Sequence, residues 1–226
     1  NTIGNSNTAI GRVSLYANTS GERNTGIGFQ AGGENITGNS NTYLGYNSGI
    51  NITAGDNNTA IGYDARVPTA TGDNQVRIGN TLVTYAEVQV PWTTTSDKRW
   101  KSDIQPSNLG LDFISKLKPV SYTRNNDELK KREYGFIAQD LEETLNASGA
   151  SDNGIISKDD AGMYSVRYND LMSPMVKAIQ EQQTMIQQQQ ELIKAMNEKM
   201  EAMQQEIDKM KSEFLITMEK EPMVKF

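Results

Sequence analysis

Cysteine and histidine are both absent from the 226 residues of this chain. Their absence excludes disulfides, thiolate nucleophiles, imidazole bases, zinc sites built from these two residues, and haem bound through either of them. Any chemistry must therefore come from hydroxyls, amines, phenols or carboxylates. We accordingly expect neither a metal nor a cofactor in this protein.

Hydrophobic residues and positive charge are also scarce. Only 36% of the residues are hydrophobic and the mean hydropathy is -0.62, so one large globular core is not expected. A net charge of -6 and a sequence pI near 4.9 disfavour nucleic acid as a partner, because binding phosphates needs an excess of lysine and arginine. The sequence has no run of 18 apolar residues, and we therefore expect no membrane insertion.

The chain does contain a repeat. The segment "NTAIG" at 7–11 recurs as "NTGIG" at 24–28, "NTYLG" at 41–45 and "NTAIG" at 58–62, always 17 residues further on. Each copy offers one short strand, turns rich in Asn and Gly that tolerate positive φ, and one apolar residue before a closing glycine. These apolar residues are Ile10, Ile27, Leu44 and Ile61, and Ile78 continues the series 17 residues after Ile61. We expect stacked coils in which each of them packs on the next repeat and on partner chains, which buries a thin continuous core.

With "GDNN" before its last copy, the repeat resembles the head repeats of trimeric autotransporter adhesins and of phage tail-fibre proteins. The resemblance covers residues 1–79 and implies a left-handed β-roll that forms a homotrimer. It also implies attachment to a host-cell surface receptor, a glycan or a protein, without indicating which. Because the chain begins inside a repeat, we expect it to be a fragment whose N-terminal region lies outside this sequence.

A heptad pattern covers the C-terminal part of the chain. One core position carries Met172, Ile179, Ile186, Ile193, Met200, Ile207 and Phe214, and the other carries Met175, Gln182, Gln189, Met196, Met203 and Met210. Six heptads predict a left-handed coiled coil about 60 Å long. Without leucine at the second position the preference for a dimer is lost, and the three-chain β-roll then favours a trimer. The glutamines are expected to set register at a cost in stability, with an ion held between three of them as the alternative reading.

The segment between the repeats and the heptads predicts a small α+β domain. "PSNLGLDFISKLKPVSY" predicts a short helix with Ser107 as its N-cap, closed by Pro119 and followed by a strand. "EYGFIAQDLEETL" predicts a strand ending near Ala138 and a helix through Leu145, and "GMYSVRYNDL" predicts one further strand. Before this domain, "TLVTYAEVQVPW" predicts a β-rich neck.

Five blocks of this region, "SDKRWKSDI", "GLDFISKLKPVSY", "GFIAQDLEETL", "YSVRYNDL" and "MVKAIQEQ", together resemble a known family. In order and spacing they are similar to the intramolecular chaperone domain at the C-terminus of endosialidases, phage tail spikes and L-shaped tail fibres. The resemblance spans about residues 92–190. It implies a domain that trimerises first, assists folding of the β-structure before it, and then cuts itself off between Thr95 and Ser96. It further implies a Ser/Lys dyad with Ser96 as the nucleophile and Lys101 as the base.

Such a dyad suits a chain without histidine. A lysine amine serves as the base where burial or neighbouring cations, here Lys98 and Arg99, favour its neutral form. Residues five apart lie about 140° apart around a helix and on opposite faces of a strand, so neither element brings Ser96 and Lys101 together. We therefore expect a bend between Asp97 and Trp100 or a contribution from a neighbouring chain of the trimer. Alternatively, Ser96 only starts a turn and the cations form a solvated face.

The sequence thus predicts a mainly β repeat followed by an α+β chaperone domain and a long trimeric coiled coil. Its segments are a β-roll over 1–79, a neck and linker over 80–95, the chaperone domain over 96–171, a coiled-coil helix over 172–218 and a tail over 219–226. The predicted function is the distal part of a virion tail fibre, or of an adhesin on a bacterial surface, that cleaves itself once and acts on no external substrate. The alternative is a structural adhesin trimer without catalysis, whose C-terminal block remains as a permanent cap.

Overall fold

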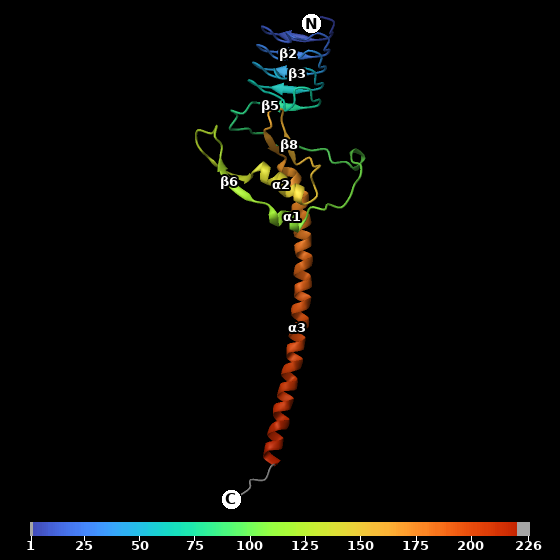
Figure 1. The fold of residues 1–226 in the computed structure, drawn as a ribbon, viewed down its shortest axis with the longest axis vertical. Helices are drawn as coiled ribbons and strands as arrows, with labels where there is room; N and C mark the ends of the chain where they lie inside the picture. Colours follow the sequence, from blue (N-terminus) through green and yellow to red (C-terminus); the bar gives the residue numbers. More distant parts are fainter. Residues whose placement is uncertain (1, 221–226) are drawn as a thin grey trace. The chain divides into compact units, whose positions relative to one another are not determined.

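The repeats form a parallel β-solenoid of about four turns. The computed structural model describes residues 2–220. Its first five strands are β1 (Thr8–Ile10), β2 (Thr25–Ile27), β3 (Thr42–Leu44), β4 (Thr59–Ile61) and β5 (Val76–Ile78). They pair in sequence order, residue for residue with the next repeat, and Figure 1 shows them stacked as successive coils. The stacked coils predicted from the repeats are confirmed.

A glycine closes each strand because the coils meet there backbone to backbone. Gly28 has a φ of +131°, and a Cβ atom built on it would lie 2.5 Å from the carbonyl oxygen of Gly45. Gly11 is in the same position one coil earlier, with a φ of +121° and a Cβ contact of 2.4 Å to the oxygen of Gly28. Only glycine accepts both this backbone conformation and this spacing.

The core of the solenoid differs from the prediction. The apolar residues that end the strands lie in register, but their side chains face outward: Leu44 is 46% exposed and Ile78 is 62% exposed. Inward-facing side chains come from strand centres, where Tyr43 and Ala60 are completely buried, because neighbouring residues of a strand point to opposite faces. The buried cluster consists of Leu15, Ala31, Tyr43, Ile52, Ala60, Ala65 and Val67. Neighbouring coils of one chain therefore do not bury the strand-end residues, and their burial by partner chains stays a prediction.

Buried asparagines form a second internal row. The side chain of Asn41 accepts a hydrogen bond from the Asn58 backbone N–H at 2.8 Å and donates one to the Gly55 carbonyl at 2.8 Å. Asn24 makes the equivalent pair of bonds one coil earlier, to Asn41 and Gly38. The same two bonds are made by Asn7 and Asn58, so the asparagines of the four "NT" motifs at 7, 24, 41 and 58 each link two repeats.

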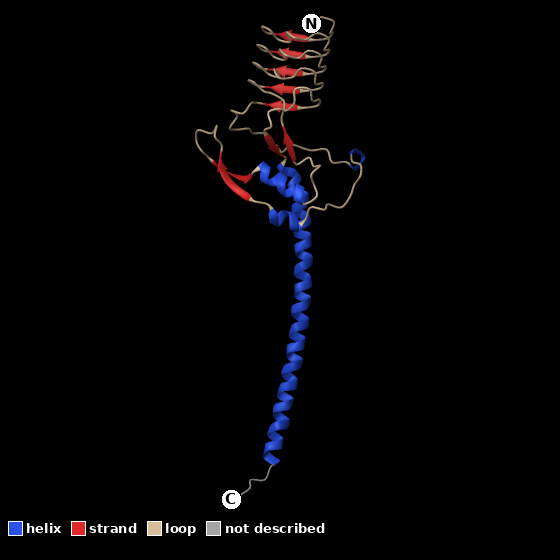
Figure 2. Cartoon of the chain, in the orientation of Figure 1, coloured by secondary structure: helices blue, strands red, loops and turns tan. Residues whose placement is uncertain are grey.

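The α+β segment contains two antiparallel hairpins and a helix (Figure 2). Its elements are β6 (Pro119–Thr123), β7 (Arg132–Phe136), α2 (Ala138–Ala147), β8 (Ile156–Lys158) and β9 (Tyr164–Val166). Glu142 on α2 accepts hydrogen bonds from Lys158 Nζ and from the Tyr164 hydroxyl, both at 2.9 Å, which ties the helix to the second hairpin. Strand β8 is missing from the sequence prediction, because three residues are too short for a periodic signal.

A second compact unit comprises α1 (Leu111–Lys116) and the long helix α3 (Met172–Lys220). The N-terminus of α1 is held by Glu181 of α3, whose carboxylate accepts the Leu111 N–H at 2.7 Å. The predicted N-cap, Ser107, is therefore wrong: its hydroxyl bonds to Leu109 instead, since the helix begins too far along the chain for it to reach. The 3₁₀ turn η2 (Tyr168–Leu171) directly precedes α3.

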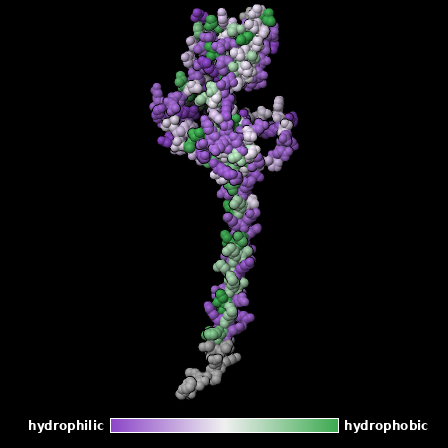
Figure 3. Space-filling model, viewed as in Figure 1, coloured by the Kyte–Doolittle hydropathy of each residue, from purple (hydrophilic) through white to green (hydrophobic). Residues whose placement is uncertain are grey.

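Helix α3 has 49 residues without a break, which gives a length of about 73 Å. Residues of the predicted heptad core lie on its surface, with Ile193 56% exposed and Met200 60% exposed. Figure 3 shows hydrophobic side chains distributed along this helix. The long helix is thus confirmed, whereas its coiled-coil partners stay a prediction. None of the helices that the structure describes is both long and apolar enough to span a membrane.

Residues 80–95 show no strand, although the structure describes all of them. The β-rich character predicted for this neck is wrong for the single chain, in which the segment is exposed and finds no strand to pair with. At the other end of the chain, residues 221–226 of the predicted tail lie outside the described residues.

Candidate functional site

A 3₁₀ turn, η1 (Lys98–Trp100), follows Ser96 closely in the chain. Asp97 caps this turn, because its Oδ1 accepts a hydrogen bond from the Arg99 backbone N–H at 2.8 Å. Two backbone bonds close it: the Trp100 N–H donates to the Asp97 carbonyl at 3.1 Å, and the Lys101 N–H donates to the Lys98 carbonyl at 3.0 Å. The chain therefore bends tightly between Asp97 and Lys101.

The bend brings together the two residues of the predicted dyad. Lys101 Nζ donates a hydrogen bond to Ser96 Oγ at 2.7 Å, and both residues belong to the same chain. The sequence required either a bend or a neighbouring chain, and the structure contains the bend. Thr95, on the other side of the predicted scissile bond, lies in an exposed segment without regular structure.

Asp97 and Arg99 form an ion pair beside the dyad. The guanidinium donates from Nε to Oδ1 at 3.0 Å and from Nη2 to Oδ2 at 2.8 Å, in addition to the backbone bond. These side-chain bonds from Arg99, followed by its backbone bond, hold the pKa of the Asp97 carboxyl below its ordinary value. The charge of Arg99 is thus paired, which differs from its expected role as a cation that favours a neutral Lys101 amine.

Solvent reaches the whole of this site in the single chain. Ser96, Lys101 and Trp100 are all exposed, with Trp100 at 81%. A serine–lysine pair works by transfer of the hydroxyl proton to a neutral amine, and exclusion of water favours that neutral form. The geometry of the pair is therefore present in one chain, while the water-excluded surroundings that would activate it are not.

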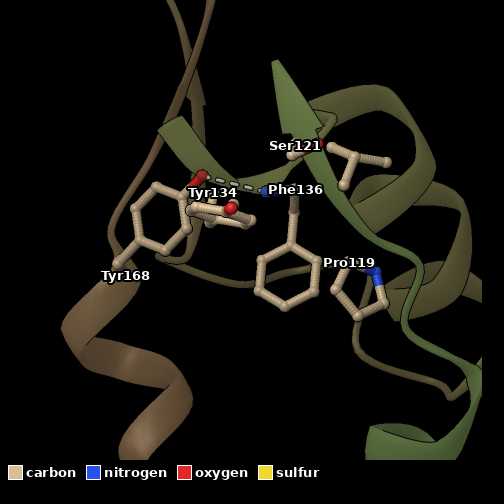
Figure 4. A pocket seen from close by; sticks show the side chains of 7 residues that line it. Pro119, Ser121, Tyr134, Phe136 and Tyr168 are labelled. Carbon is tan, nitrogen blue, oxygen red and sulfur yellow. Dashed lines mark hydrogen bonds between the residues drawn. The ribbon is translucent and has the colours of Figure 1, made fainter. Parts of the chain in front are cut away.

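Apart from the Ser96–Lys101 site, an aromatic groove with a volume of about 490 Å³ lies on the β6–β7 hairpin. Figure 4 shows the Tyr168 hydroxyl accepting a hydrogen bond from the Phe136 backbone N–H, at 3.1 Å, with the two rings stacked 6.2 Å apart. The groove is lined by Pro119, Val120, Ser121, Tyr134, Gly135, Phe136 and Tyr168. This lining carries no carboxylate or amine, so it offers no general acid and base pair comparable to the Ser96–Lys101 contact.

The function of Asp97 as a cap was missed in the sequence. Aspartate is among the residues preferred immediately before a helical turn, and Asp97 stands directly after the serine of interest. The expected bend between Asp97 and Trp100 was placed without assigning a cap to Asp97, and the turn that Asp97 caps is what places Lys101.

Comparison with protein families gives a match at this site. The model of the family described as chaperone of endosialidase matches residues 96–150, so the matched region begins at Ser96 itself and includes η1, α1, β6, β7 and α2. Comparison with curated proteins found no match. Residues 96–150 are thus similar to an endosialidase chaperone domain, attached here to a β-solenoid and a long helix as in a tail-fibre-like protein.

Proposed function

We propose that this chain is the distal part of a homotrimeric tail fibre whose C-terminal region is an intramolecular chaperone that cleaves itself off. The observation that carries the proposal is the Lys101–Ser96 hydrogen bond of 2.7 Å, located where the match to the endosialidase chaperone family begins. The same family match supports a chaperone role for residues 96–150. Attachment to a host-cell receptor through the repeats, and a place on a virion or bacterial surface, belong to this proposal.

Self-cleavage proceeds from the Ser96–Lys101 pair in two steps. Lys101, once its amine is neutral, takes the proton of Ser96 Oγ, and the oxygen bonds to the carbonyl carbon of Thr95. The carbon–nitrogen bond then breaks, the Ser96 nitrogen receives the proton from Lys101, and Thr95 becomes an ester of the serine. A water molecule hydrolyses this ester, leaving a carboxylate on Thr95 and a free amine on Ser96. No substrate pocket is needed, because the attacked carbonyl belongs to the adjacent residue.

Trimerisation is supported by two exposed apolar surfaces. The outer face of the solenoid carries the row of strand-end residues, among them Ile10 at 58% and Ile78 at 62% exposure. Helix α3 carries the heptad residues, among them Ile179 at 63% and Phe214 at 63% exposure. Apolar surfaces of this extent are covered in most soluble proteins, and association of three copies would cover each of the two. The absence of leucine from the second heptad position disfavours a dimer.

A chaperone is useful here because of how the solenoid folds. Its strands are three residues long and pair only with strands of other repeats, so no coil is stable until several have formed. Helix α3 forms through local contacts and can associate early, which would hold three chains in register while the coils stack. Cleavage at Thr95–Ser96 would then separate the solenoid from its chaperone and make assembly irreversible. The product would persist because it unfolds slowly.

The exposure of Ser96 and Lys101 favours a second candidate function. If assembly leaves these side chains in water, the pair is not activated and the C-terminal block remains attached as a permanent cap on a structural adhesin. A Ser96→Ala chain separates the candidates: self-cleavage requires it to stay intact where the wild type is cut, while a permanent cap requires both to stay intact.

The chaperone role is tested by comparing assembly of the Ser96→Ala chain with that of a chain ending at Thr95. We expect the first to have the native mass of three copies, and the second to remain largely monomeric or to aggregate when produced alone. Equal yields of assembled solenoid from both chains would contradict the chaperone role. A native mass other than three copies for the Ser96→Ala chain would contradict the homotrimer.

A further inference from the structure

The contacts between Asp97 and Arg99 stabilise the turn that separates the two residues of the dyad. Three hydrogen bonds link these residues, two of them from the guanidinium and one from the backbone N–H. We propose that Asp97 is a positioning residue for self-cleavage, which acts by holding the η1 turn closed so that Lys101 meets Ser96. This inference rests on the proposed self-cleavage and names the group that sets its geometry.

Asp97 can control the distance between Lys101 and Ser96 because its hydrogen bonds lie within the turn that separates these two residues. Among the described residues, the only hydrogen bond between Lys101 and Ser96 is the side-chain bond of 2.7 Å, and the Lys101 backbone N–H donates to the Lys98 carbonyl. If the turn opens, the backbone extends and the distance between residues 96 and 101 grows well beyond hydrogen-bond reach. Asp97 opposes this opening in two ways: its carboxylate accepts the Arg99 N–H, and it fixes the Arg99 side chain.

The ion pair is chemically suited to a turn that must remain in water. A cap based on a carboxylate keeps its acceptor over a wide pH range, and a guanidinium can bond to both carboxylate oxygens at once. Asp97 touches neither Ser96 Oγ nor Lys101 Nζ in any hydrogen bond of the described residues, so its effect passes through the turn.

The first test measures the rate of self-cleavage of the full chain. Removal of a cap acceptor shifts a helical turn toward the open form by about fivefold, so Asp97→Ala is expected to slow cleavage by about that factor or more. Asp97→Asn keeps an oxygen that can cap Arg99 but loses the charge, and its rate is expected to return to within about threefold of the wild type. Rescue by Asn distinguishes positioning from loss of folding.

A double-mutant cycle identifies the route of the effect. If Asp97 acts through the guanidinium as well as the cap, Arg99→Gln slows cleavage slightly in the wild type but adds nothing to Asp97→Ala. The matched control is Asp112→Asn, which removes another exposed ion pair, with Lys116, from the same matched region and is expected to leave the rate unchanged. Additive effects of the two changes at 97 and 99 would contradict the inference.

A second measurement does not depend on cleavage. In the uncleavable Ser96→Ala chain, hydrogen exchange of the peptide containing residues 97–101 is followed by mass spectrometry. Asp97→Ala is expected to accelerate exchange in this peptide by about fivefold while other peptides are unchanged. Unchanged exchange would overturn the positioning role. If the wild type never cleaves, the proposed function fails, yet this measurement still decides whether Asp97 holds the turn.

Discussion

Replacement of Tyr43 by phenylalanine is expected to stabilise the solenoid. Tyr43 is completely buried in β3, and its hydroxyl has no hydrogen-bond partner among the described residues. Burial raises the pKa of this phenol well above its ordinary value, with Asp56 contributing less, which reflects the same lack of solvation. A buried hydroxyl without a partner costs about 1–3 kcal/mol, so Tyr43→Phe is expected to gain about 1 kcal/mol or more.

The ring itself has the opposite effect, because it fills the coil between two glycines. A Cβ atom on Gly32 or on Gly49 would lie 2.2 Å and 2.1 Å from this ring, so the space is fully occupied. Tyr43→Ala would leave a cavity that these neighbours cannot fill, and it is expected to destabilise the solenoid by about 3–5 kcal/mol.

The assay is denaturant unfolding of the full Ser96→Ala chain at one fixed protein concentration. Tyr63→Phe serves as the control, since Tyr63 is 62% exposed and its change is expected to stay within about 0.5 kcal/mol of zero. A loss of stability in Tyr43→Phe would refute the reasoning, because it would mean that the hydroxyl has a partner outside the described chain.

Three further predictions concern the coils, the long helix and α1. Gly28→Ala is expected to lower stability more than Gly149→Ala in the same unfolding assay. Both glycines have positive φ, but only a Cβ on Gly28 would collide with another coil of the solenoid. Equal losses of stability would contradict this. Ile193→Asp, which places a charge in the heptad core, is expected to abolish the trimer in sedimentation experiments, whereas Gln188→Asp, on the opposite side of the helix, is not; a trimer in both would contradict the coiled coil. The pKa of Glu181 is lowered chiefly by the Leu111 N–H bond, with a smaller contribution from Lys177, so its stabilisation of α1 is present above the ordinary pKa of 4.5 and is lost as pH falls through the lowered value. The Leu111 amide shift should report this loss below pH 4.5, and an equal titration in Glu181→Gln would contradict it.

The solenoid could be predicted from sequence because its signal is repeated. Five copies of one spacing fix the register of five strands, and the closing glycines mark where coils touch. Which side of the strand faces inward could not be predicted in the same way. Strands of three residues carry too little alternation to show it, and the buried positions vary from glycine to tyrosine. The inner face, which Tyr43 and Ala60 occupy in the single chain, was therefore not recognised from the sequence.

The two residues of the candidate site could be predicted from the sequence, but the contacts that bring them together could not. Ser96 and Lys101 stand out by their residue types and by resemblance to a family, and the need for a bend followed from their spacing. The means of bending lay in Asp97 and Arg99, whose pairing depends on side-chain geometry that a spacing of two residues does not reveal. Likewise, the N-terminus of α1 is capped by Glu181, which is far away in the sequence. Rules for helix caps consider only residues next to the helix in the chain, so they could not predict this contact.

The most direct measurement of the central claim is the denatured mass of freshly produced wild-type chain, beside Ser96→Ala and Lys101→Ala. We expect two fragments that meet between Thr95 and Ser96 in the wild type, and an intact chain in both variants. An intact wild-type chain within a folded trimer would contradict self-cleavage and leave the C-terminal block as a permanent cap. Cleavage that persists in Lys101→Ala would contradict the role of the Ser96–Lys101 contact.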